Sequence, residues 1–167
     1  MTLQKRFGRY GKEGIIETLE RIIAEHPFFS GLDGGFTNLM TGCASNVQFK
    51  SGDYILKEGD PANTFYLIRS GKVALEVLAP QHKPIIIATL GEGEILGWSW
   101  LLAPYQWKFH ARAVDAVRAI ALDGKCLRSK CEENHDLGYE VLKRFAQIME
   151  RRLEATRLQL LDVYAVR

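Results

Sequence analysis

The residues best suited to chemistry lie in one stretch, residues 91–113, which is rich in glycine and aromatic side chains and holds all three tryptophans of the chain. Gly91, Gly93 and Gly97 lead into a short run that predicts one helical turn, closed by Pro104. Glycines before a helix let backbone N–H groups approach an anion, and the helix N-terminus adds partial positive charge. The stretch could therefore cradle a phosphate. Taken alone, the glycines favour the alternative, a tight turn of a β-barrel whose tryptophans fill core.

The composition is that of an ordinary globular protein. With 167 residues, the chain predicts one domain with a full core and an additional helix. Its net charge of +2 gives no strong basic field for nucleic acid. Basic side chains cluster only within residues 5–12, which indicates a short solvated arm whose role the sequence does not define.

The lack of a recognisable signal peptide or membrane span, together with the few cysteines, favours the cytoplasm. The longest apolar run, Ile85–Leu90, is too short to span a bilayer, and residues 1–9 lack the apolar core of a signal peptide. We therefore expect a cytoplasmic protein that does not associate with membranes. Cys43, Cys126 and Cys131 form an odd and sparse set, which is consistent with reduced thiols.

The glycine- and tryptophan-rich stretch must be positioned by the elements around it. The spacing of apolar residues along the chain changes from helical to strand-like before this stretch is reached. Helical spacing of apolar residues predicts a first helix over residues 15–23, ending before Pro27, and a shorter one over residues 36–43. Alternating runs between glycine turns then predict strands, of which Ile85–Leu90 reads as buried on both faces. The predicted strands are residues 47–49, 54–56, 65–68, 73–77, 85–90, 107–113 and 117–122. Many short strands with glycine turns indicate a jelly-roll or barrel.

Helical periodicity returns at the C-terminus. A short helix is predicted around residues 126–131, and a long one from about Leu137 to about Val163. Along the long helix an a/d seam alternates steps of four and three, which predicts a dimeric coiled coil. The seam residues are Leu142, Ala146, Met149, Leu153, Thr156, Leu160 and Val163. The alternative is an amphipathic helix packed on its own domain, because Phe145, Ile148 and Leu158 lie beside the seam.

The order of turns and strands resembles the cyclic-nucleotide-binding domain of the CRP/FNR regulators, a module also found in protein kinase A regulatory subunits and cyclic-nucleotide-gated channels. The matching segments are Gly52–Leu56, Gly59–Asp60, Phe65–Ile68 and Gly71–Val73, with Pro27–Leu32 and Ala111–Ala113. The resemblance implies a mainly β fold with flanking helices, a double-stranded β-helix or jelly-roll followed by a long C-terminal helix. The expected parts are an N-terminal helix and arm (1–26), the β-roll (27–124) and C-terminal helices for dimerisation (125–167).

In this family a phosphate-binding cassette occupies the place of residues 93–113. Its usual form is a Gly-Glu pair followed, some ten residues on, by Arg and a small hydroxyl residue. Here Gly97 is followed by Trp98, and the arginine position falls at Trp107 or Lys108, depending on one residue of register. Arg112 belongs to the following strand. The resemblance implies these ligand-binding candidates: Gly93, Glu94, Gly97, Trp98, Ser99, Trp100, Trp107 and Lys108.

These departures predict weak or altered cyclic nucleotide binding. Trp98 offers one N–H donor and no acceptor for a ribose hydroxyl, and Lys108 offers a point charge in place of an arginine fork. Losing one charge-assisted contact costs about 1.5–3 kcal/mol. The tryptophans would either fill the cavity or reshape it for an apolar or aromatic ligand. Because Trp107 is in phase with Phe109 and Ala111, we expect it to face the interior of the roll.

We interpret the chain as a non-catalytic regulatory sensor domain of signal transduction, a homodimer in which a small-molecule effector shifts the last helix. A cyclic nucleotide is the ligand, and the only cofactor, that the resemblance suggests. One alternative is a ligand-free interaction and dimerisation module acting on a partner regulator. A cupin-like metal enzyme is disfavoured, because the histidines stand singly and only Cys126, Cys131 and His135 approach a cluster. The helix-turn-helix domain of the family does not follow Val163, so we expect no direct specific DNA binding from this chain.

Overall fold

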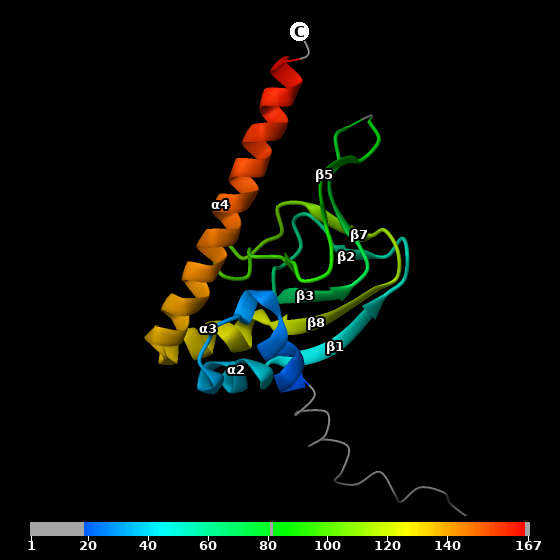
Figure 1. Ribbon diagram of the computed structural model, residues 1–167. Helices are drawn as coiled ribbons and strands as arrows, with labels where there is room; N and C mark the ends of the chain where they lie inside the picture. The colour runs from blue at the N-terminus through cyan, green and yellow to red at the C-terminus, as the bar shows by residue number, and fades with distance from the viewer. Residues whose placement is uncertain (1–18, 81, 166–167) are drawn as a thin grey trace, which may run out of the picture. The chain divides into compact units, whose positions relative to one another are not determined.

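The structure is a computed structural model that describes residues 19–80 and 82–165 (Figure 1). The chain divides into two compact units, residues 1–129 and 130–167. The first unit contains the strands and the cassette, and the second contains the whole of the long C-terminal helix. The beginning of the predicted first helix, residues 15–18, lies outside the described residues. Its remainder is helical, and the helix continues to residue 25.

Eight antiparallel strands form two four-stranded sheets, which confirms the predicted jelly-roll fold. In the first sheet the order is β1 (Ala44–Phe49), β8 (Val117–Asp123), β3 (Thr64–Ser70) and β6 (Ile95–Leu96). In the second it is β2 (Tyr54–Leu56), β7 (His110–Ala113), β4 (Val73–Val77) and β5 (Ile85–Leu90). Strands distant in sequence thus lie side by side, as β1 and β8 do in Figure 1.

Glycine turns join the strands where the sequence predicted them. Gly71, between β3 and β4, has a φ of +89°, a conformation that favours glycine. A Cβ there would lie 2.4 Å from the carbonyl oxygen of Ala116, so only glycine fits this close approach. The turn therefore fixes the β3–β4 connection against the loop that precedes β8.

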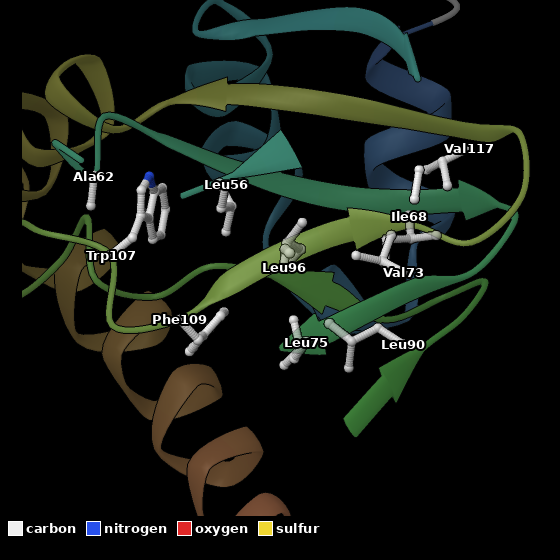
Figure 2. Close-up of a cluster of buried hydrophobic side chains, with 12 residues drawn as sticks. Leu56, Ala62, Ile68, Val73, Leu75, Leu90, Leu96, Trp107, Phe109 and Val117 are labelled. Atoms are coloured by element: carbon white, nitrogen blue, oxygen red, sulfur yellow. The ribbon is translucent and has the colours of Figure 1, made fainter. Parts of the chain in front are cut away.

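The core of the roll lies between the two sheets. Its buried side chains include Leu56, Leu75, Leu96, Trp107 and Phe109, drawn in Figure 2. Ala62 and Trp107 lie at one end of this cluster, and Val117 lies at the other (Figure 2). Because successive side chains of a strand point to opposite faces, these residues line the inside, and alternate residues face solvent or the helices.

Short helices belong to the same unit as the roll. They are η1 (Pro27–Phe29), α2 (Gly34–Thr41) and α3 (Gly124–Glu133), the last of which continues into the second unit. Asp33 caps α2 by accepting a hydrogen bond from the backbone N–H of Gly35 at 2.8 Å. Phe28 is buried, with its ring 5.5 Å from that of Phe65 on β3, which anchors the entry segment to the first sheet.

Two sequence expectations are wrong. The strand Ile85–Leu90 is not buried on both faces, because Ile85, Ile86 and Ile87 are 53%, 56% and 42% exposed. Figure 1 shows β5 and the loop before it extending away from the rest of the roll, which explains the exposure. Cys43 and Cys126 are not free thiols but form a disulfide, because pairing of β1 with β8 brings together residues 83 positions apart. Cys131 is free.

The second unit is dominated by α4 (His135–Ala165), close to the predicted span. Its buried side chains, Leu137, Val141 and Phe145, lie near its beginning. Among the seam residues, Met149 is half-buried, and Leu142, Ala146, Leu153, Thr156, Leu160 and Val163 are exposed in the single chain. Leu158, which sequence placed beside the seam, is also exposed. The C-terminal half of α4 therefore presents several exposed apolar side chains.

Candidate functional site

The cassette begins with a turn that uses its own carboxylate. Gly93 has a φ of +80°, and its N–H donates to the carbonyl of Ile68 at 2.9 Å. The Ile68 N–H in turn donates to the carbonyl of Glu94 at 2.9 Å. The Glu94 carboxylate accepts from the backbone N–H of Gly91 at 2.7 Å. Gly93 and Glu94 thus fasten the start of the cassette to β3.

Trp107 occupies the space over Gly97. Gly97 is buried with a φ of +89°, and a Cβ there would lie 2.7 Å from Cη2 of the Trp107 ring. Trp107 is 5% exposed and belongs to the roll core, which confirms its predicted inward orientation. In Figure 2 its ring lies between the labelled Ala62 and Leu56. Glycine is therefore required at 97 both for its backbone conformation and for this close approach.

Only some of the predicted ligand-binding residues lie close to one another in the structure. Trp98 is half-buried, and its ring meets Phe109 edge-on with centroids 6.3 Å apart. Gly97, Trp98 and Trp107 thus gather at one side of the roll core. Lys108, which follows Trp107, is exposed.

Ser99 and Trp100 are both buried, and Trp100 packs against the first sheet. Trp100 is fully buried and stacks on Phe65, with centroids 5.8 Å apart and planes inclined by 17°. The predicted helical turn is absent from this segment, where Leu101 N–H donates to the Trp98 carbonyl in an isolated turn. No helix N-terminus is therefore available here to stabilise a phosphate.

Arg112 lies on strand β7, as the sequence interpretation expected, and it has a structural partner. Its Nε donates to Oε1 of Glu76 at 2.9 Å, and Nη2 donates to the same oxygen. Glu76 lies on the adjacent strand β4 and is fully buried, so the ion pair at Oε1 offsets part of the cost of burying its charge, while Oε2 has no hydrogen-bond partner among the described residues. Between residues 93 and 110, Lys108 is then the single cationic side chain.

Sequence reasoning missed Arg128. This residue of α3 donates from Nη1 to the carbonyl of Trp100, and its guanidinium carbon lies 4.3 Å from the ring centroid of Tyr105. Tyr105 itself has a positive φ of 56°. Arg128 therefore holds the two ends of the Trp100–Tyr105 segment against α3. No sequence signal could have revealed this contact between residues so far apart in the chain.

The loop of residues 57–64 holds the cassette and α3 at once. The N–H of Gly59 donates to the Trp107 carbonyl, and the N–H of Trp107 donates to the Asp60 carbonyl, both at 3.0 Å. On its other side, the Asn63 carbonyl accepts from the N–H of Gly124, the first residue of α3, at 2.8 Å. One short loop therefore links the cassette to the start of α3 through main-chain hydrogen bonds.

A hollow of 370 Å³ opens beside this loop. Lys57, Asp60, Asn63 and Trp107 are among its lining residues. Tyr66 also lines it, and burial raises the pKa of its phenol above the usual value. The hollow combines aromatic and polar walls and adjoins Trp107, so a small ligand there would touch the loop that holds the cassette.

The part of the chain that the structure describes contains no candidate metal site. Across residues 19–80 and 82–165, no group of three or more His, Cys, Asp or Glu side chains is placed to hold a metal ion. The near-cluster of Cys126, Cys131 and His135 is excluded as a ligand set, because Cys126 is bonded to Cys43. Within the same described ranges, no helix has the length and apolar character needed to cross a bilayer.

Known proteins share this architecture. A family model described as the cyclic nucleotide-binding domain matches residues 46–134. A CRP-like cAMP-activated global transcriptional regulator of Mycobacterium tuberculosis is 26% identical over 145 residues, which are 87% of this chain and 63% of the relative. The chain thus spans less than two thirds of that relative.

Solved structures of other proteins have a similar fold. A provisionally assigned cyclic nucleotide-binding protein of Geobacter metallireducens superposes with a TM-score of 0.72 at 27% identity, over 81% of this chain and 98% of that chain. The regulatory subunit of a cAMP-independent protein kinase A from Trypanosoma brucei has a TM-score of 0.68 at 23% identity, over 87% and 51%, and shows the fold alone. Because the family match covers more than half of the sequence, the chain belongs to the cyclic nucleotide-binding domain family.

Proposed function

We propose that this chain is a non-catalytic regulatory sensor domain whose cassette has lost most of its affinity for cyclic nucleotides. The observation that carries the proposal is the contact of the Trp107 ring with Gly97, which fills the roll where the family places its phosphate arginine. Arg112 is paired with Glu76, and Lys108 is exposed, so neither supplies a fork directed into the roll. The effector that suits such a cassette is a small apolar or aromatic molecule.

The proposed signal passes from the cassette to α3. An occupant beside Trp107 displaces the loop of residues 57–64 or the segment held by Arg128. Both contacts end on α3, so its direction changes, and α4 follows it in the chain. This is a two-state switch in which the ligand favours the state that it binds more tightly. The relatives that are regulators support a role of this kind without catalysis.

We further propose that the protein acts as a homodimer through α4. The seam residues Leu142, Leu153, Leu160 and Val163 are 48–72% exposed in the single chain. Apolar side chains repeated at a and d positions over about three heptads are stabilised by pairing with a second helix. We place this dimer in the cytoplasm.

Titration of the full chain with cyclic AMP and cyclic GMP tests the sensor proposal. We expect dissociation constants weaker than micromolar by calorimetry, together with small shifts in melting temperature, because two charge-assisted anchors are missing. Adenosine and indole, which lack phosphate, test the preference for an uncharged aromatic ligand and are expected to shift the melting temperature more. Micromolar binding of cyclic AMP would contradict the proposed loss of affinity.

A second function, a ligand-free module that binds a partner regulator, is favoured by one observation. The β4–β5 hairpin exposes Val77, Leu78, Ile85, Ile86 and Ile87, and apolar side chains exposed together on one element can mark an interaction site. A chain that binds none of the four probes but forms a stable complex with a partner, lost in Ile86→Ser, would favour this second function. Retention of the complex in that variant would remove the hairpin from consideration.

A further inference from the structure

Strands β1, β8 and β3 place polar side chains on one outer face of the first sheet. The register puts Gln48 of β1 directly opposite Arg118 of β8. Asn46, two residues before Gln48, shares its face. Val117 and Ala119, which flank Arg118, are buried, so Arg118 points outward, and it is exposed.

A β-bulge brings Arg69 of β3 to the same face. Between two consecutive pairings with β8, the β3 strand advances from Ile68 to Ser70 while β8 advances by one residue, so Arg69 is the extra residue. Bulges of this kind re-aim a side chain. Nη1 of Arg69 donates to Oδ1 of Asn46 at 3.0 Å, which carries its guanidinium across β8 and fixes its orientation.

These side chains line a hollow of 470 Å³, here named the β1–β8–β3 hollow. Its described lining is Ile22, Asn46, Val47, Gln48, Arg69 and Arg118, and none of these residues carries a carboxylate. Within residues 19–80 and 82–165, neither arginine forms an ion pair. Two guanidinium groups without a counter-charge repel each other across neighbouring strands, and an anion between them removes that repulsion.

We propose that the β1–β8–β3 hollow binds the phosphate group of a small molecule. A phosphate dianion matches two positive charges, and its oxygens suit the planar donors of arginine. Asn46 and Gln48 carry amide groups that add N–H donors to the same face. Ile22 supplies an apolar surface for the organic part of a phosphate monoester. This site is separate from the cassette and does not depend on the function proposed for it.

Calorimetry of the full chain with inorganic phosphate and with phenyl phosphate, in a buffer free of other oxyanions, tests the proposal. We expect saturable binding in both cases, weakened by high salt. Arg118→Gln and Arg69→Gln should each weaken it about tenfold or more, because each removes a charge-assisted contact. Arg157→Gln, which removes an exposed arginine of α4 outside the seam, is the matched control and should bind like the parent. Tighter binding of phenyl phosphate, lost in Ile22→Ala, would identify a monoester as the natural form, and equal binding would identify free phosphate.

Three outcomes would overturn the assignment. They are absence of saturable phosphate binding, equal binding by both arginine variants and the parent, and preference for succinate over phosphate. Amide chemical shifts of the parent protein provide a test that does not depend on how the variants fold. Phosphate should perturb Gln48 and Arg118, and perturbation confined to Gly97 and Trp98 would place the anion in the cassette instead.

Discussion

At position 107 a tryptophan lies inside the roll, and at position 108 a lysine is exposed. This alternation supports the register in which Trp107, rather than Lys108, stands at the family's arginine position. An arginine fork at 107 would project toward the space over Gly97, whereas one at 108 would remain in water, where a charge contributes little to binding.

Restoring both anchors at the inward positions should therefore restore affinity. We expect Trp98→Glu combined with Trp107→Arg to bind cyclic AMP at least about tenfold more tightly than the parent, because one ribose acceptor and one phosphate fork return. Calorimetry measures the change. The matched control is Trp98→Glu with Lys108→Arg, which should show no such gain. A gain of cyclic AMP affinity in the control alone would place the family's arginine position at Lys108 instead.

Trp107 is also expected to be the main structural residue of the cassette. Trp107→Ala should lower the free energy of unfolding by about 3–5 kcal/mol, because a large buried ring is removed from a close-packed core. Trp98→Ala should cost less, since Trp98 is half-buried and water can replace part of its ring. Urea denaturation of both variants checks the order, and equal losses would show that Trp98 is packed as firmly as Trp107.

His26 makes stability depend on pH. It is 6% exposed, its Nδ1 accepts from the N–H of Phe28, and burial lowers its pKa from 6.5 to about 4. At a pH between these two pKa values, His26 is protonated in the unfolded chain but not in the folded one. The free energy of unfolding therefore falls as the pH decreases through this range. The loss attributable to His26 is about 3 kcal/mol at pH 4 relative to neutral pH. Denaturation of His26→Gln should show a flatter acid limb than the parent, and an unchanged limb would assign the effect to carboxylates.

At the scale of the elements, the disulfide joins the segment after α2 to the first turns of α3. Cys43 immediately precedes β1, and Cys126 is the third residue of α3. The N–H of Asp123, one residue before α3, also donates to the Cys43 carbonyl at 2.9 Å. The bond therefore reinforces a junction that the backbone already makes.

Reduction should destabilise this junction without unfolding the roll. Because the bond closes a loop between residues 83 positions apart, we expect reductant to lower the free energy of unfolding by about 2–4 kcal/mol in the parent. Cys43→Ala should show the lower value in either condition. Cys131→Ala, which removes the free thiol, is the control and should respond to reductant like the parent.

The elements also show how far sequence reasoning reaches. Glycine turns and alternation predicted seven of the eight strands, because these signals are local. The two-residue strand β6 was not predicted, and β7 begins at His110 rather than at residue 107. The exposure of Ile85–Ile87 was not predictable, since an unbroken apolar run does not reveal whether other elements cover it. The contact of Arg128 with Trp100 and the Cys43–Cys126 pair depend on strand order, which joins distant residues only in the folded chain.

For the whole molecule, the exposed half of α4 is the feature that most affects assembly. We expect the parent to sediment as a dimer at micromolar concentration, and Met149→Glu with Leu153→Glu to sediment as a monomer, because two charges would then face each other across the seam. Glu154→Lys, a charge change at an exposed position outside the seam, is the control and should remain dimeric. A monomeric parent would contradict the proposed dimer.

The loop of residues 57–64 carries a consequence for how such domains diversify. Its bonds to Trp107 and Gly124 run through main-chain atoms, which every residue type except proline can supply. The side chains that choose a ligand can then be exchanged while the connection to α3 stays intact. Recognition and transmission are thus separable in this fold, and a new effector specificity could arise at the cassette without redesigning the mechanism that reports it.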